Sequence, residues 1–219
     1  MLQDFNAQKF LVGLIVLVVS ITFHEFGHAI SADRLGDPGP RRDGRVNVWP
    51  DRHFDPLGFI MMCVILLTGF GLGWGRPVLV DPRHFANPRK GMVIVAAFGP
   101  LMNLLIAVIA GLCIRFYAPS HPFWLASSTV SGDFAQDFLL FNLSLMFFNL
   151  LPLYPLDGSK ILSGLMPEEM ARQFDRFGAQ YGSFILLGLI FLGGNVLGRI
   201  LNPPVIATAR LILGPSLGL

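Results

Sequence analysis

The chain has 219 residues, of which 53% are hydrophobic and only 14% are charged, and its mean hydropathy is +0.61. So few charges cannot cover a water-facing surface, which all but excludes a soluble globular protein and excludes a disordered one. The net charge of +2 is too small, and the charges are too scattered, to indicate nucleic-acid binding.

Apolar runs long enough for membrane helices follow one another along the chain. A helix needs about 20 apolar residues to cross a bilayer core of about 30 Å. We expect spans at about 9–31, 91–114, 136–156 and 177–198. The run 57–75 either spans or re-enters, and 200–214 is a weak C-terminal membrane segment interrupted by prolines. The sequence therefore predicts a single all-α, multi-pass integral-membrane domain over residues 1–219.

The first span carries the motif His24-Glu25-Phe26-Gly27-His28 near its far end. Residues four apart share one face of a helix, so the imidazoles of His24 and His28 can reach one metal ion. Imidazole ligands with one open coordination position are typical of catalytic zinc, and the neighbouring Glu25 is placed to act as a general base. The alternative is a pair of interfacial histidines at the end of a span. A glutamate inside a membrane helix is costly, however, unless it has a function.

The polar stretch after the first span contains a strand-like pattern. Residues 45–49 alternate between turn-forming clusters, and residues 77–80 can pair with them. The sequence thus predicts a small β-ribbon, or a re-entrant segment, near the histidine motif. His53 and His84 lie in arginine-rich loops, where we expect solvated side chains rather than metal ligands.

The fourth span ends close to a carboxylate. Pro152 and Pro155 must break its helix just before Asp157. Unwound backbone at membrane depth is tolerated only where it is buried in protein or lines a wet cavity. A catalytic zinc usually has three protein ligands, and Asp157 is a better third candidate than Glu168 or Glu169, which follow in an amphipathic connector. From these residues alone, it is equally open that Asp157 only caps the next helix.

Seven motifs resemble the site-2 protease family of intramembrane zinc metalloproteases, in a short form without a PDZ or regulatory domain and without a span before the zinc helix. The most specific are H-E-F-G-H-A at 24–29 and N-L-L-P-L-Y-P-L-D-G at 149–158. The others are L-G-D-P at 35–38, G-R-V-N-V at 44–48, H-F-D-P-L-G at 53–58, G-W-G-R-P-V at 73–78 and G-P-L-M-N at 99–103.

This resemblance implies a three-helix catalytic core, accompanied by further membrane helices, with one Zn²⁺ per chain. In the family pattern, the metal ligands correspond to His24, His28 and Asp157, and the general base corresponds to Glu25. Asn149 would orient the substrate backbone or stabilise the oxyanion. For Asn149, and also for Asn103, the residues equally allow a role in joining helices, because an amide inside an apolar span needs a partner. The implied activity is zinc-dependent endoproteolysis of the transmembrane segment of a single-span membrane protein, as in regulated intramembrane proteolysis.

Two other functions stay open. A membrane-anchored zinc protease that cuts at the membrane surface would use a glutamate as third ligand, but glutamates are scarce in this chain. A metal carrier would use His24, His28 and Asp157 as a transport site, but carriers need further ligands along a path. The sequence predicts neither the substrate nor the oligomeric state.

Two features favour a run 57–75 that re-enters the lipid bilayer without crossing it. First, Asp157 reaches the depth of the histidines only if one crossing is removed. Second, a re-entrant run leaves only Lys9 and Arg115 outside among the cations that flank the runs, whereas a full span divides those cations almost evenly. Because cations gather on the cytoplasmic side, we expect the zinc site near the cytoplasmic face of the plasma membrane.

Overall fold

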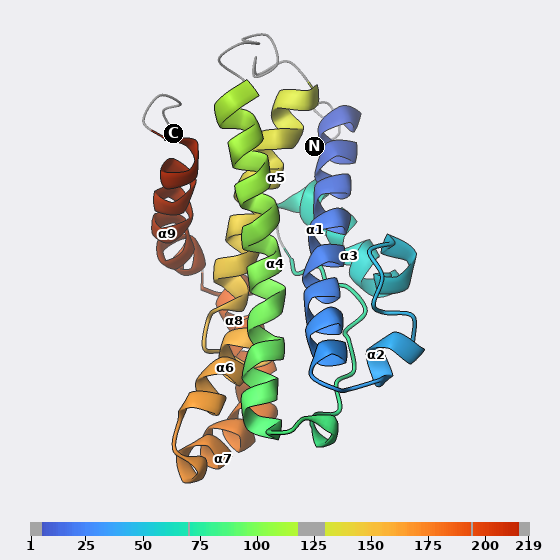
Figure 1. Cartoon of the computed structure of the whole chain (residues 1–219). Coiled ribbons are helices and arrows are strands. Elements are labelled where there is room, and N and C mark those ends of the chain that lie inside the picture. Colours follow the sequence, from blue (N-terminus) through green and yellow to red (C-terminus); the bar gives the residue numbers. More distant parts are fainter. Residues whose placement is uncertain (1–5, 70, 118–129, 194, 215–219) are drawn as a thin grey trace.

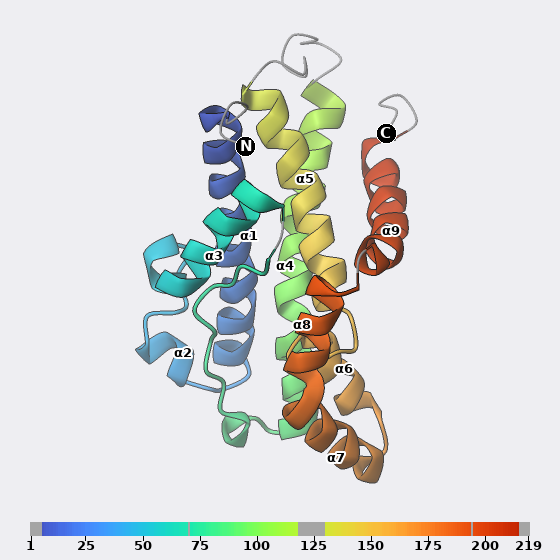
Figure 2. The same cartoon turned by 180° about the vertical axis from the view of Figure 1, so that it is seen from behind.

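The computed structural model of the chain describes residues 6–69, 71–117, 130–193 and 195–214 (Figures 1 and 2). Within these ranges, every regular element is helical. Three of these helices are long and apolar enough to cross a membrane: α1 (Ala7–Arg34), α4 (Pro88–Tyr117) and α9 (Val196–Leu213). The all-helical architecture predicted from the composition is therefore confirmed over these ranges.

The centre of the molecule is a layer of three antiparallel helices, α1, α4 and α5 (Val130–Asn149). In Figure 1, α1 runs down, α4 runs up beside it and α5 runs down again. The side chain of Asn6 caps the start of α1 by accepting a hydrogen bond from the Lys9 amide. Gly36, at φ 108°, turns the chain away just after α1 ends. The long helix α4 thus lies in the middle of this layer, and both α1 and α5 pack against it.

Short elements connect the ends of α1 and α4. They are α2 (Gly39–Arg42), η1 (Pro50–His53), α3 (Pro56–Thr68) and η2 (Pro82–His84). Helix α3 begins at Pro56 behind the Asp55 cap and ends at Gly69 in a left-handed conformation. Its 13 residues measure about 20 Å, which is shorter than a bilayer core. Irregular backbone from 71 to 81 then returns to the foot of α4 (Figure 2).

The C-terminal third packs against the other side of the central layer. It consists of α6 (Asp157–Leu165), α7 (Glu168–Phe177), the π-helical turn η5 (Gly178–Gly182), α8 (Ser183–Phe191) and α9. Apolar residues of α4, α5 and α9 form one buried core. Its members are Ala107, Ile114, Ala135, Leu139, Leu143, Val205, Ala209 and Leu213. This burial keeps α9 beside α4 and α5.

Several predicted features differ from the structure. The β-ribbon is not supported, because neither 45–49 nor 77–80 forms a strand and no described residue does. Polar groups of these segments instead contact Glu25 of the candidate metal centre. The run 177–198 is helical from the end of α7 through the π-helical turn η5 to the end of α8 at Phe191, and helix α9, which starts at Val196, passes through Pro203 and Pro204. Residues 70 and 194, which belong to two of the predicted runs, lie outside the described ranges.

Candidate metal centre

Three side chains from two helices converge at the lower part of α1. His24 Nε2 and His28 Nε2 are 3.1 Å apart, and each lies 3.2 Å from Asp157 Oδ2. All three residues are buried. Tetrahedral zinc with bonds of about 2.0 Å holds its ligand atoms roughly 3.3 Å apart, so the triangle has the size of one face of such a site. Among the described residues, this is the one cluster of this kind.

The hydrogen bonds on the far sides of the imidazoles determine which nitrogens face the cluster. His24 Nδ1 lies 2.7 Å from Asn103 Oδ1, and His28 Nδ1 lies 2.8 Å from the Val95 carbonyl oxygen. Both partners accept, so both Nδ1 atoms carry the proton and both Nε2 atoms present lone pairs. The short Nε2–Nε2 distance is therefore not a hydrogen bond, and it suits two ligands of one cation.

The surroundings leave space and unmet bonding capacity for that cation. Asp157 Oδ2 is buried and has no hydrogen-bond partner. A Cβ atom added at Gly99 of α4 would stand 2.4 Å from His28 Nε2 and 2.8 Å from His24 Cε1. Only a glycine at this position therefore allows α4 to pack so closely against the two imidazoles. The donor set of two imidazoles and one carboxylate, with no thiolate, fits zinc with one coordination position left open.

Asp157 reaches the cluster because the chain breaks after α5. The helix ends at Asn149, an irregular turn follows, and α6 starts at Asp157 itself. Leu156 occupies the N-cap position and makes no side-chain cap, so the alternative of Asp157 as a capping residue is not supported. Lys160 Nζ lies 3.7 Å from the other oxygen of Asp157, Oδ1, which leaves Oδ2 to face the histidines.

Glu25 lies beside the triangle and is held from outside the helix. Its Oε2 accepts a hydrogen bond of 3.1 Å from the Val78 amide, so the segment predicted as a β-strand supplies a donor to this carboxylate. Arg45 Nη2 lies 3.9 Å from the same oxygen. The Glu25 side chain is 14% exposed, and it opens onto a cavity.

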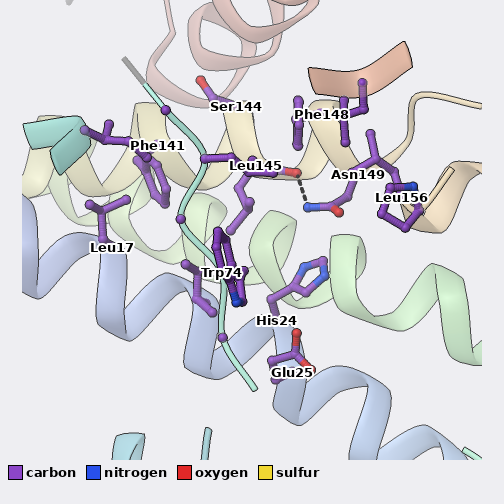
Figure 3. A pocket seen from close by; sticks show the side chains of 18 of the residues that line it. Leu17, His24, Glu25, Trp74, Phe141, Ser144, Leu145, Phe148, Asn149 and Leu156 are labelled. Atoms are coloured by element: carbon purple, nitrogen blue, oxygen red, sulfur yellow. Dashed lines mark hydrogen bonds between the residues drawn. The ribbon is translucent and has the colours of Figure 1, made fainter. Parts of the chain in front are cut away.

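That cavity has a volume of about 410 Å³ and is shown in Figure 3. His24 and Glu25 form one end of its lining, Ser144 and Asn149 contribute polar groups from α5, and the rest is mostly apolar. Backbone of Gly71–Gly75 crosses it between α1 and α5. Asn149 Nδ2 donates to the Leu145 carbonyl at 3.0 Å. A cavity of this size and character accommodates apolar side chains of a peptide.

Some predicted residues behave otherwise than the sequence indicated. His53 is buried at 3% exposure, not solvated; its Nε2 donates to the Asn47 carbonyl, and the residue lines a small cavity together with Trp74 and Gly75. Burial lowers the pKa of His53, which keeps the ring neutral. His84 is half exposed, as expected. Glu168 and Glu169 pair with Arg172 and stay outside the cluster.

Other residues of the centre were missed or left open by the sequence. Asn103, expected only to need a partner, orients His24 and also donates to the Ser20 carbonyl and to Asn142. Asn142 in turn donates to Ser20 Oγ. These three side chains are fully buried. The only available signal was the presence of polar residues inside apolar spans, and it did not say which of them meet.

The chain is similar to known zinc metalloproteases. The family model described as peptidase family M50 matches residues 125–192, which include Asn149 and Asp157. YwhC of Bacillus subtilis, named as a zinc metalloprotease, is 38% identical over 86% of this chain and 85% of its own. Rip2 of Mycolicibacterium smegmatis, named likewise, is 30% identical over 82% of this chain and 68% of its own. MJ0611 of Methanocaldococcus jannaschii, also named so, is 28% identical over 73% of each chain. No solved structure matches.

Proposed function

The chain belongs to peptidase family M50, the site-2 protease family, and is a metalloprotease; on this premise we propose that it cleaves peptide bonds within or beside the transmembrane segments of other membrane proteins. One observation carries the proposal. His24, one of the candidate ligands, and Glu25 line an apolar cavity among helices, two of which are long and apolar enough to span a bilayer. A peptide that reaches this site must itself be apolar.

We assign the metal ligands to His24, His28 and Asp157, with one zinc per chain. When bound there, zinc supplies a Lewis acid that polarises a carbonyl group and lowers the pKa of water. The chain's own residues do the rest. Asn103 and the Val95 carbonyl orient the two imidazoles. Asp157 adds a negative charge that favours a divalent cation, and its Oδ1 is kept aside by Lys160.

Glu25 acts as the general base and then as the general acid. Its Oε2 is occupied by the Val78 amide, whereas no hydrogen bond among the described residues uses Oε1. Oε1 therefore takes the proton of the attacking water and passes it to the nitrogen of the leaving amine. The largely apolar lining of the cavity keeps bulk water away from this transfer.

The substrate has to be extended at the scissile bond, because a helical carbonyl is already hydrogen-bonded and shielded. The segment Gly71–Gly75 supports this part of the proposal. Its backbone lines the cavity, and its N–H and C=O groups make no hydrogen bond to any described residue. An unwound substrate can pair with these groups as an added strand. We propose Asn149, on the α5 side, as a further contact to the substrate backbone or the oxyanion.

We further propose a multi-pass protein of the plasma membrane, with the zinc site near the cytoplasmic face and the run 57–75 re-entrant. The shortness of α3 and the position of the α1 C-terminus and α4 N-terminus at the same end of the molecule support this topology (Figure 1). In a protein with Cys63→Ala and Cys113→Ala, we expect Asp43→Cys and Arg83→Cys to react with an impermeant thiol reagent only from the cytoplasm. Lys9→Cys should react from outside. Labelling of positions 43 and 83 from opposite sides would contradict the topology.

Comparison of membrane proteomes tests the activity. Cells that carry Glu25→Gln should accumulate an uncut single-span protein that wild-type cells process, while the purified variant keeps its zinc. A surface-cutting protease would instead release fragments cut outside the bilayer. Metal flux that persists in Glu25→Gln, with no change in any membrane protein, would favour a carrier and refute the proposal.

A further inference from the structure

Arg45 is a buried arginine in the loop between α2 and η1. Its relative exposure is 4%, although it lies in the polar part of the chain where most arginines are solvated. The loop is fixed close to it, since the Arg45 amide donates to the Pro40 carbonyl at 2.8 Å. Arginines are almost never fully buried unless they are paired, so this side chain needs a partner.

The guanidinium has two partners, both at the candidate active site. Nη2 donates a hydrogen bond to the Arg76 carbonyl oxygen, and the same nitrogen lies 3.9 Å from Glu25 Oε2. The Arg76 amide, in turn, donates to the His53 carbonyl at 2.9 Å. Arg45 thus connects the loop 43–55, the segment 76–78 and the carboxylate of Glu25.

The opposite charges of Arg45 and Glu25 account for this arrangement. A buried charge is tolerated only beside an opposite one, and Glu25 is the acid within salt-bridge distance of Arg45. Arg45 Nε is buried without a hydrogen-bond partner, so the loop does not satisfy the guanidinium by itself. His53 is held neutral by burial, which leaves Arg45 as the cation of this loop nearest to Glu25.

We propose that Arg45 is a positioning residue, which holds Glu25 Oε2 through its charge and holds the Val78 amide donor through the Arg76 carbonyl. The Arg45 charge and the Val78 amide both act on Glu25 Oε2, so the free Oε1 keeps one orientation towards the metal site. Arg45 does not line the cavity and therefore acts on the base and not on the substrate. This inference rests on the proposed role of Glu25.

A double-mutant cycle on the metal-free protein in detergent tests the Arg45–Glu25 coupling without any substrate. Arg45→Met should lower the Tm of the wild type, because it removes the cation beside the largely buried Glu25 carboxylate. In the Glu25→Gln protein, Arg45→Met should lower the Tm by about 2–4 °C less than it does in the wild type. Arg52→Met is the matched control, because Arg52 lies in the adjoining turn η1, is exposed and pairs with Asp51. Its shift should be equal in both backgrounds.

Cleavage of fluorescent-labelled casein in detergent gives the functional readout. Arg45→Met should lower kcat about 10–100-fold with KM within about twofold and zinc content unchanged. Arg45→Lys, which keeps the charge but lacks the second donor arm, should recover part of kcat. Additive Tm shifts, or a folded Arg45→Met protein with wild-type kcat, would overturn the proposal. If Arg45→Met does not fold, Arg45→Lys replaces it in both assays, and unchanged kcat or additive shifts would overturn it. If the wild type does not cut casein, the Tm cycle alone decides on Arg45, and additive Tm shifts would then overturn the proposal.

Discussion

Two segments bring the candidate ligands together, and they do so in opposite ways. Helix α1 is continuous, so the spacing of His24 and His28 alone puts both imidazoles on one face. Before Asp157, by contrast, the helical conformation is interrupted over residues 150–156, and no local spacing directs Asp157 towards the histidines. Its position depends on contacts from elsewhere in the chain.

Those contacts can be named. Gly158 packs against the carbonyl groups of Leu150 and Leu151. Arg89 of α4 donates to the Ser163 carbonyl at 2.8 Å and also to the Met166 carbonyl, and so holds the end of α6. The common face of a ligand pair on a helix is thus set by its spacing, whereas the position of a ligand after a helix break depends on many neighbours. Four substitutions test this difference, in order of decreasing expected effect.

Gly158→Ala should have the largest effect. The added Cβ would stand 2.2 Å from the Leu150 carbonyl oxygen and 2.4 Å from that of Leu151, and backbone cannot move aside as a flexible side chain can. Asp157, its neighbour, must shift, and we expect zinc affinity to fall about 100-fold or more. Zinc titration of the purified protein measures this. Gly188→Ala in α8, where the new Cβ meets nothing within 4 Å, should bind zinc normally.

Asn103→Leu tests the limit of the local rule for α1. It removes the acceptor that fixes the His24 Nδ1 proton and leaves Asn142 without one of its hydrogen bonds. We expect zinc affinity to fall about 10–100-fold, as for other residues that orient a ligand, with helix content unchanged by circular dichroism. Unchanged affinity would mean that α1 orients His24 without help.

Arg89→Met should loosen only the segment that carries Asp157. It removes charge-assisted hydrogen bonds to two carbonyl groups of α6 and its C-terminal end, worth about 1–2 kcal/mol. The Tm should fall by about 3–6 °C, and zinc affinity should fall less than for Gly158→Ala. Lys90→Met, at the adjacent exposed position, should leave both quantities unchanged. Equal effects of the two substitutions would show that Arg89 does not hold α6.

Arg172→Ala should have the smallest effect, although Arg172 makes two ion pairs with Glu168 and Glu169 in the next helix along. All three side chains are more than half exposed, and such pairs contribute about 0.5 kcal/mol or less. Thermal unfolding should show a Tm change within about 2 °C. A larger change would mean that α7 supports Asp157 more directly than its contacts indicate.

The same contrast explains what the sequence could predict. Periodicity and composition are local, so they predicted the apolar helices and the histidine pair. The prolines before Asp157 predicted a break but not where it leads. The alternation at 45–49 resembled a strand. In the structure, however, the Arg45 side chain lies beside Glu25, and the Val78 amide donates a hydrogen bond to the Glu25 carboxylate instead of to a neighbouring strand.

The remaining differences also have tertiary causes. Asn103, Asn142 and Ser20 come from three different helices, and no sequence spacing relates them. Helix α9 passes through Pro203 and Pro204, which sequence rules treat as helix breakers. Its buried residues, among them Val205 and Ala209, pack into the core with α4 and α5, and this packing offsets the lost hydrogen bonds.

Zinc content of purified Asp157→Ala tests the central assignment most directly. The wild type should hold about one zinc per chain after dialysis, and Asp157→Ala should hold almost none, because two imidazoles alone do not retain the ion. The double variant Glu168→Ala and Glu169→Ala, which removes both glutamates of the C-terminal third, should keep wild-type zinc. Full zinc in Asp157→Ala, or its loss from the glutamate variant, would contradict the proposed metal centre.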